Sequence, residues 1–175
     1  MPKKLIDLER KIIAVAKEII ATEGYEALSM RSIAQKSKVA VGTIYNYYPD
    51  KNAILGGIVG IDWVTLEAEL FVKFKTIPSL KEGIKLLYDA FISFSKEHQD
   101  LFSYFTTSGN AAYYASYRNF VDQGSELLRI LGKQFGVKAN EHRYNMAASM
   151  FSYAIHYPNV PYIEIEDSIL KLLQQ

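Results

Sequence analysis

The chain has 175 residues, which is enough for one ordinary domain or for a small domain of about 50 residues joined to a larger one. Apolar residues make up 49% of it and charged residues 22%, a composition typical of globular proteins rather than of disordered or fibrous ones. It contains no cysteine, which excludes disulfide bonds and thiolate chemistry and is compatible with a reducing compartment.

No segment has the pattern of a secretion signal or a membrane span. The N-terminus lacks the long apolar core of a signal peptide. The longest apolar stretch, residues 53–61, ends at Asp62 and is much shorter than the roughly 20 residues of a transmembrane helix. We therefore expect a cytoplasmic protein.

The formal net charge of +1 is unevenly distributed. Residues 1–51 carry nine Lys and Arg against six Asp and Glu, whereas residues 52–175 carry eleven against thirteen. The basic excess lies in the N-terminal segment, where it would attract a phosphate-rich partner. The excess is modest and identifies no partner by itself.

The N-terminal segment has the pattern of four consecutive helices. Apolar residues recur at helical spacing as far as Gly24, which is typical of a helix C-cap. Ser29 and Asp50 are placed to cap later helices, and Pro49 interrupts the chain before the fourth. The predicted helices run to about residue 24, from about 30 to 36, from 41 to 48 and from 51 to 75.

The rest of the chain is helical in pattern as well. Ser79 and Glu82 fit a capping box, in which each side chain bonds to the other's backbone amide. The predicted helices begin at about residue 80 and then cover about 100–107, 111–135, 140–157 and 163–173. No segment alternates over the length of a strand, so we predict an all-α fold of about eight or nine helices.

The predicted helix at residues 41–48 carries the most specific functional pattern. Residues four apart share a helix face, so Ile44 and Tyr48 form one apolar row that can pack inward. The other rows carry small, hydroxyl or amide side chains, at Val41, Gly42, Thr43, Tyr45, Asn46 and Tyr47. Two helices joined by a short turn, the second exposed in this way, form the helix-turn-helix that reads a DNA major groove.

The same residues carry a resemblance to a known family. The matching run is GYEALSMRSIAQKSKVAVGTIYNYYPDKNAIL, residues 24–55. It contains an apolar-Arg-x-Ile-Ala element at residues 30–34, a Gly-Thr-Ile-Tyr-x-Tyr-Tyr core at residues 42–48 and a lysine, Lys51, that opens the next helix. Through these elements, residues 8–55 resemble the DNA-binding domain of the TetR family of transcriptional regulators.

The resemblance implies a role for each matching side chain. Phosphate contacts are implied for Ser29, Thr43, Tyr45, Tyr47 and Lys51. Positions nearest the base edges are implied for Arg31, Val41, Gly42 and Asn46. The alternative for the tyrosines is burial in the core, which we favour for Tyr48 only; for Lys51 it is a solvated residue at a helix start.

Two residues depart from the family's pattern. Lys38 stands where the family usually has a turn glycine, and a lysine with positive φ costs about 1 kcal/mol. Ala40 replaces the usual serine cap, which removes about 1 kcal/mol of helix initiation. Both changes concern local stability rather than the motif.

Three glycines, Gly56, Gly57 and Gly60, lie inside the predicted fourth helix, where each costs about 1 kcal/mol relative to alanine. One explanation is close packing of this helix against the first. The other is a hinge, because in the family this helix joins the DNA-reading domain to the sensing domain.

The resemblance also implies a small-molecule pocket in the C-terminal part and dimerisation through its last two helices. Aromatic side chains with hydroxyl groups suit the walls of such a pocket and favour a lipophilic or cationic effector. The candidate pocket residues are Phe102, Phe105, Tyr113, Tyr117, Phe120 and Phe151. The alternative is that these rings form the hydrophobic core.

No catalytic or metal-binding pattern is visible. His98, His142 and His156 lie far apart in the sequence and have no second ligand at metal spacing, so we expect surface or capping residues and no cofactor. An all-α small-molecule enzyme is therefore disfavoured. The other rival is a helical docking protein whose DNA reader has lost its function.

We predict a homodimeric DNA-binding regulator. A helix-turn-helix domain at residues 1–51 precedes a helical effector-binding and dimerisation domain at residues 52–175. The predicted partners are a near-palindromic double-stranded DNA operator, a small-molecule effector and a second copy of the chain, without a membrane. A repressor released by its effector is favoured over an activator.

Overall fold

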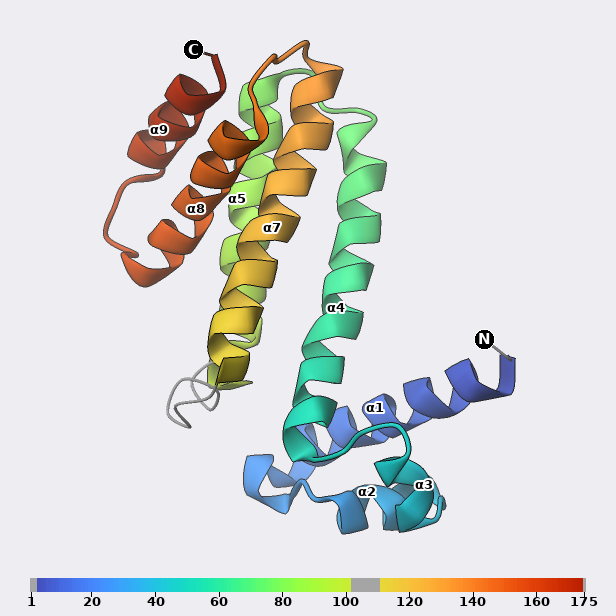
Figure 1. The fold of residues 1–175 in the computed structure, drawn as a ribbon. Coiled ribbons are helices and arrows are strands. Elements are labelled where there is room, and N and C mark those ends of the chain that lie inside the picture. Colours follow the sequence, from blue (N-terminus) through green and yellow to red (C-terminus); the bar gives the residue numbers. More distant parts are fainter. Residues whose placement is uncertain (1–2, 102–110, 175) are drawn as a thin grey trace. The chain divides into compact units, whose positions relative to one another are not determined.

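The computed structural model describes residues 3–101 and 111–174, with side chains described for residues 7–101 and 120–174. Every element in these ranges is a helix (Figure 1), which confirms the predicted all-α fold. The elements are α1 (Lys3–Glu23), the 3₁₀ helix η1 (Tyr25–Ala27), α2 (Met30–Ser37), α3 (Val41–Tyr45), α4 (Lys51–Phe74), α5 (Leu80–Glu97), α7 (Ala111–Gln134), α8 (Glu141–His156) and α9 (Tyr162–Gln174). Most of the helix predicted at residues 100–107 lies outside the described residues.

Side-chain caps fix several helix starts where the sequence predicts them. Ser29, Asp50, Ser79 and Asn140 each accept a hydrogen bond from the backbone N–H three residues later, at 3.0, 2.8, 3.3 and 3.0 Å. These bonds satisfy amides that have no partner inside the helix. Gly24 follows α1 with a φ of 84°, a backbone conformation that side chains with a Cβ rarely adopt.

The chain divides into two compact units, Met1–Thr65 and Leu66–Gln175. The division falls inside α4, whereas the sequence predicts a domain boundary at residue 51, the first residue of that helix. The early turns of α4 belong to the N-terminal unit because their apolar side chains complete its small core. Helical periodicity marks where a helix begins but not which neighbours it packs against.

The N-terminal unit is built around an aliphatic core. The stripe predicted on α1 faces inward, and α2, α3 and α4 each add buried side chains to it. The buried apolar residues are Ile12, Ile13, Ala16, Ile19, Leu28, Met30, Ile33, Ala34, Ile44, Tyr48, Ile54, Leu55, Ile58 and Trp63. Burial of this apolar surface is what holds such short helices together, since isolated helices of this length are marginal in water.

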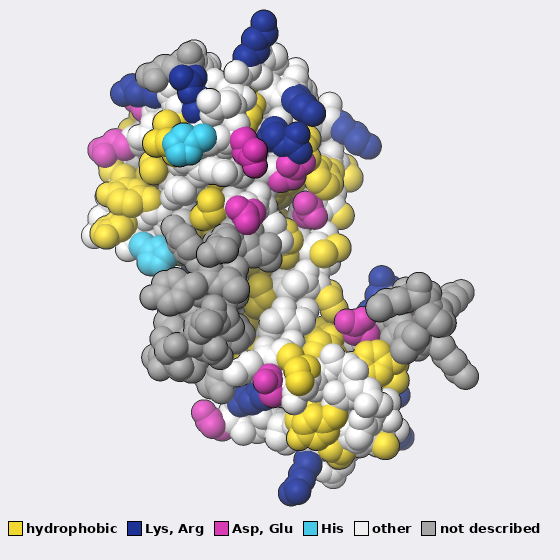
Figure 2. All heavy atoms as spheres, viewed as in Figure 1, with side chains coloured by type: hydrophobic (Ala, Val, Ile, Leu, Met, Phe, Trp, Pro, Cys, Tyr) yellow, Lys and Arg dark blue, Asp and Glu magenta, His cyan; other side chains and the backbone are white. Residues whose placement is uncertain are grey.

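The C-terminal unit contains α5, α7, α8 and α9, with α8 packed between α7 and α9 (Figure 1). Aromatic rings fill its centre: Phe91 stacks on Phe151 with ring centroids 5.0 Å apart and meets Phe120 edge-on at 4.5 Å. A partly buried ion pair joins α5 to α9, with Lys81 Nζ 2.9 Å from Glu166 Oε1. On the face shown in Figure 2, basic and acidic side chains are intermixed over this unit.

Candidate nucleic-acid interface

The helix predicted at residues 41–48 is shorter in the structure. α3 has five residues, and the chain continues through Asn46 and Tyr47 as a turn whose backbone bonds are partly of the tighter i→i+3 kind. The predicted end at residue 48 is therefore wrong by about one turn. The helix ends where the Tyr47 amide bonds to the Ile44 carbonyl, and Pro49 contributes by disfavouring the α conformation in Tyr48, the residue that precedes it.

The predicted division between inward and outward rows is confirmed by burial. Ile44 is 0% exposed and Tyr48 6%, whereas Tyr45 is 52% exposed. Asn46 is also exposed, and Tyr47 is half-buried. Because the apolar row anchors the segment, its neighbouring side chains present hydroxyl and amide groups at the surface of the unit.

The remaining predicted contact residues lie on the same unit. Val41, Gly42, Arg31 and Ser29 are exposed, and Thr43 is half-buried. Ser29 is also part of a reciprocal cap with Ser32: its Oγ accepts from the Ser32 amide at 3.0 Å, and its own amide donates to Ser32 Oγ at 2.9 Å. α2 thus begins at a fixed point, next to the side chain of Arg31.

The turn between α2 and α3 shows both departures from the family pattern. Lys38 adopts the left-handed conformation, with φ 55° and ψ 38°, and is the one non-glycine residue with positive φ among the described residues. Ala40 precedes α3 without a side-chain hydrogen bond to its amides. The start of α3 is therefore held by its backbone and by packing rather than by a cap.

Lys51, at the start of α4, points back into the unit. Its Nζ donates a hydrogen bond of 2.7 Å to the backbone carbonyl of Tyr25 in η1. This contact links α4 to the loop that leads to α2, and it accounts for a cation at a helix start, where the helix dipole is unfavourable to it. The implied phosphate contact of Lys51 stays a prediction.

Part of the basic excess of the N-terminal unit is paired internally. Lys36 Nζ lies 2.6 Å from Glu23 and 3.5 Å from Glu18, and the hydrogen bond to Glu23 is the main cause of the raised pKa of Lys36. Lys17 pairs with Asp62. Charges available to attract phosphate are therefore fewer than the sequence count of nine suggests.

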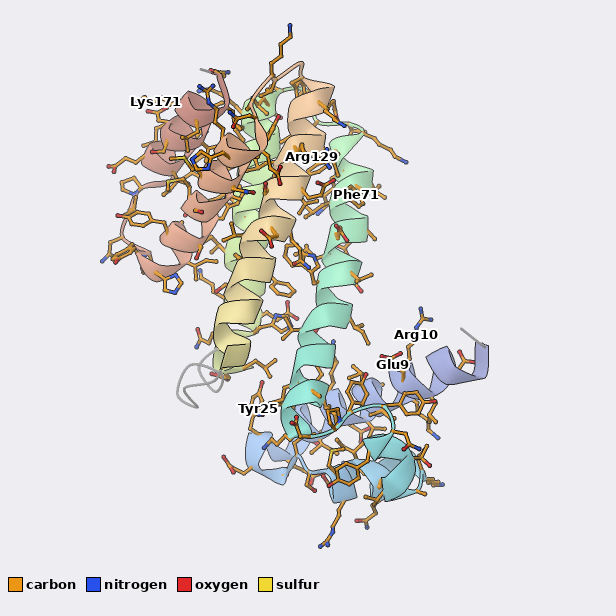
Figure 3. All side chains as sticks on the ribbon, viewed as in Figure 1. Glu9, Arg10, Tyr25, Phe71, Arg129 and Lys171 are labelled. Carbon is orange, nitrogen blue, oxygen red and sulfur yellow. The ribbon has the colours of Figure 1, made fainter. Side chains whose placement is uncertain are left out.

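Sequence reasoning missed a contact that joins distant parts of this unit. The Tyr48 hydroxyl donates to Glu9 Oε1 at 3.3 Å, across 39 positions of sequence. Burial, together with the nearby Glu9 carboxylate, raises the pKa of Tyr48 to about 12. Figure 3 labels Glu9 on α1. No local pattern could have indicated this pairing, because Glu9 has the appearance of an ordinary solvated residue.

The predicted aromatic pocket is only partly described. Phe102 and Phe105 lie outside the described residues, and so do the side chains of Tyr113 and Tyr117. Phe151 is 0% exposed and Phe120 half-buried, and both contact Phe91 in the ring cluster of the C-terminal unit. The surroundings of these two residues fit the alternative interpretation, in which the rings form part of the hydrophobic core.

Two surface hollows on the C-terminal unit involve other residues. One, about 610 Å³ in volume, is lined mainly by polar side chains of α7 and α8, including Ser125, the ion-paired Glu126 and Arg129, and Asn145. The other, about 430 Å³, lies beside Phe135 and the end of α9. Neither contains a residue of the predicted aromatic pocket.

The histidines are placed separately. His142 and His156 are exposed, whereas His98 is buried at the end of α5, its Nδ1 3.0 Å from the Phe94 carbonyl. In the described part of the chain, no group of three His, Cys, Asp or Glu side chains is arranged to hold a metal ion. Nor is any helix there both long and apolar enough to cross a membrane.

Comparisons with known proteins agree with the geometry of the N-terminal unit. The family model described as "Bacterial regulatory proteins, tetR family" matches residues 12–58. The repressor KstR of Mycolicibacterium smegmatis is 35% identical over 60 residues, which are 34% of this chain and 29% of KstR. The uncharacterised regulator YuxN of Bacillus subtilis is 25% identical over 148 residues, 82% of this chain and 48% of YuxN.

The likeness in fold extends to the C-terminal unit. The structure of Thermus thermophilus FadR, a TetR-family repressor in complex with lauroyl-CoA, matches 94% of this chain and 92% of that one, with a TM-score of 0.63 and 20% identity. The aligned part of the chain spans less than a third of KstR's length. The helix-turn-helix with its matching sequence run identifies residues 12–58 as a DNA-binding domain of the tetR family of bacterial regulatory proteins, and the helices that follow share the fold of TetR-family structures.

Proposed function

We propose that this protein is a sequence-specific DNA-binding transcriptional regulator, a repressor that a small-molecule effector releases from its operator. The observation that carries the proposal is the orientation of residues 41–48. Their apolar row, Ile44 and Tyr48, is buried, while hydroxyl and amide groups beside it remain at the surface. A short helix presented in this way fits a major groove.

The exposed groups suit two kinds of contact with DNA. Hydroxyl and ammonium groups bind phosphate oxygens and fix the position of the protein on the duplex. We assign this role to Ser29, Thr43, Tyr45, Tyr47 and Lys51. Asn46 can pair with an adenine edge and Val41 can contact a thymine methyl, while Gly42 allows close approach and Arg31 reaches toward the groove.

A second copy of the chain is the expected partner of α8 and α9. Met146, Tyr153 and Tyr157 on or next to α8, and Ile163 on α9, are large apolar side chains that are exposed in the single chain. The rings of Tyr153 and Tyr157 lie against each other with centroids 4.6 Å apart. Symmetric pairing through this surface would give two DNA-reading units, which bind half-sites about 34–36 Å apart in a near-palindromic operator.

The effector would act by shifting a population. The dimer would have two forms, one in which the spacing between the DNA-reading units fits the operator and one in which it does not. A ligand that binds the second form more tightly lowers the operator affinity, by an amount set by the difference between its affinities for the two forms. Lauroyl-CoA, the ligand in the structure of Thermus thermophilus FadR, is a reasonable first probe for the lipophilic effector that the sequence favours. A regulator of this kind acts on the DNA of the cell, hence in the cytoplasm.

The test is selection of duplexes from a random pool by the purified protein, followed by measurement of affinity as a function of salt. We expect enrichment of an inverted repeat, bound by two chains, with affinity that falls steeply as salt rises. The triple variant Thr43→Ala, Tyr45→Phe, Asn46→Ala should lose the enriched sequence. Recovery of no sequence at any salt concentration would refute the proposal and favour the docking protein with an inactive reader.

A further inference from the structure

Three glycines of α4 have different surroundings. A Cβ added at Gly56 or Gly60 would meet nothing within 4 Å. A Cβ added at Gly57 would lie 2.9 Å from Ile13 Cδ1, closer than real Cβ atoms pack, and 3.0 Å from Tyr48 Cε1, which is tighter than most real Cβ contacts. Of the two explanations for these glycines, close packing against α1 therefore applies to Gly57 alone.

The ring that occupies this space belongs to the residue that anchors the DNA-reading segment. Tyr48 follows α3, and its backbone amide donates to the Ile44 carbonyl at 2.9 Å. Its hydroxyl donates to Glu9 of α1 at 3.3 Å, and its ring edge occupies the space that a side chain at Gly57 of α4 would fill. Tyr48 thus connects the end of α3 to both α1 and α4.

Besides its packing against α2, α3 has few features of its own that fix its orientation. It is five residues long, its N-cap Ala40 makes no side-chain hydrogen bond, and the turn before it contains the strained Lys38. A helix of this length has negligible stability by itself, so the packing of Ile44 and Tyr48 determines how it is presented. Moving the Tyr48 ring would move Tyr47 and Asn46, which are its immediate neighbours in the chain.

We infer that Gly57 is a positioning residue for DNA recognition: the absence of its side chain creates the space that holds Tyr48, and Tyr48 holds the DNA-reading residues 45–47 in place. The inference rests on the proposed DNA-binding function. It assigns Gly57 no contact with DNA, and it separates Gly57 from Gly56 and Gly60 in the same helix.

The test compares alanine at the three glycines, using the duplex that the parent protein selects and a random duplex of equal length. We expect Gly57→Ala to bind the selected duplex roughly ten-fold more weakly, because overpacking of this size displaces neighbouring groups, while its affinity for the random duplex is unchanged. Gly56→Ala and Gly60→Ala, which add a methyl group in open space, should bind both duplexes as the parent does. Affinities are measured well below each variant's unfolding temperature, so that a variant that is less stable but still folded does not show a lower affinity for that reason alone.

A second substitution tests the route through the core. Ile13→Val removes the Cδ1 atom that the new Cβ would meet. The double variant Ile13→Val, Gly57→Ala should therefore bind the selected duplex at least about three-fold more tightly than Gly57→Ala alone. If Gly57→Ala does not fold, Tyr48→Phe decides instead. It removes only the hydroxyl that reaches Glu9, and we expect binding of the selected duplex to weaken roughly three-fold.

The outcomes separate the two proposals. A parent protein that selects no sequence overturns the proposed function and this inference together. A parent that selects a sequence, with Gly57→Ala binding it as Gly56→Ala does, overturns the inference alone. Equal weakening on the selected and random duplexes, or a Tyr48→Phe variant that binds as the parent does where Gly57→Ala fails to fold, overturns it as well.

Discussion

Lys38 offers a direct measurement of the backbone strain in the turn of the helix-turn-helix. Its φ of 55° and ψ of 38° place it in the left-handed region, where the Cβ of an L-residue approaches the following carbonyl and costs about 1–2 kcal/mol. Glycine removes that cost. It also increases the conformational entropy of the unfolded chain, which takes back roughly 0.4–1 kcal/mol.

The expected net effect of Lys38→Gly is therefore a stabilisation of the N-terminal unit by about 0.8 kcal/mol, the middle of the range of about 0 to 1.6 kcal/mol that these two values allow. It corresponds to an increase of about 3–6 °C in the unfolding temperature of a unit of this size. The chain has a single tryptophan, Trp63, which lies in this unit and is 4% exposed. Its fluorescence during thermal or urea unfolding therefore follows the loss of structure around α4 at the end of this unit.

Two matched variants separate backbone strain from charge. Lys38→Ala removes the ammonium group but keeps the Cβ, and should leave the midpoint within about 0.5 kcal/mol of the parent's, as exposed substitutions usually do. Lys38→Asn keeps a side chain that tolerates this conformation and should fall between alanine and glycine. If alanine raises the midpoint as much as glycine does, then lysine charge, not backbone conformation, destabilises the turn.

Three further predictions concern the two units separately. Asn46→Ala should relax the preference for one base in each half-site, at a cost of about 1–3 kcal/mol for the preferred base, as measured by competition between duplexes that differ at single positions. Gly83→Ala should destabilise the C-terminal unit by about 1–3 kcal/mol, because a Cβ there would overlap the Leu131 side chain. Circular dichroism during urea unfolding measures the loss. If Gly83→Ala is just as destabilising in a Leu131→Ala background, the overlap with Leu131 is not the cause. The Lys81 ammonium, 2.9 Å away, lowers the pKa of Glu166. The stability that Glu166 contributes is therefore complete above the ordinary carboxyl pKa of about 4.3 and is lost as the pH falls through the lower pKa of the folded state. Unfolding profiles between pH 3 and 7 should therefore be flatter at the acid end for Glu166→Gln than for the parent.

Local patterns were sufficient for much of the fold and for the outline of the site. Ser29, Asp50 and Ser79 cap helices where the sequence predicts them, because a cap acts within three residues of itself. The inward row of Ile44 and Tyr48 follows from helical spacing, which requires no knowledge of the partner surface. The positive φ of Lys38 was expected from the family resemblance, because the family usually has a glycine at this turn position.

Other features depended on which distant segments meet. Glu9 and Tyr48 are 39 positions apart, and only the folding of the N-terminal unit brings them together. Phe151 has the same side chain whether it lines a pocket or fills a core, and its contact with Phe91 decides its present surroundings. Lys51 belongs by sequence to the start of a helix, yet its ammonium group bonds to the Tyr25 carbonyl.

The three glycines of α4 illustrate the physical reason. By sequence alone Gly56, Gly57 and Gly60 are equivalent, since each lowers helix propensity by the same amount. Propensity, capping and periodicity depend on neighbours along the chain, and these determined the helices and the exposed face of the DNA-reading segment. Packing depends on neighbours in space, and only the tertiary structure showed that Ile13 and Tyr48 occupy the position of a side chain at Gly57 and at neither of the others.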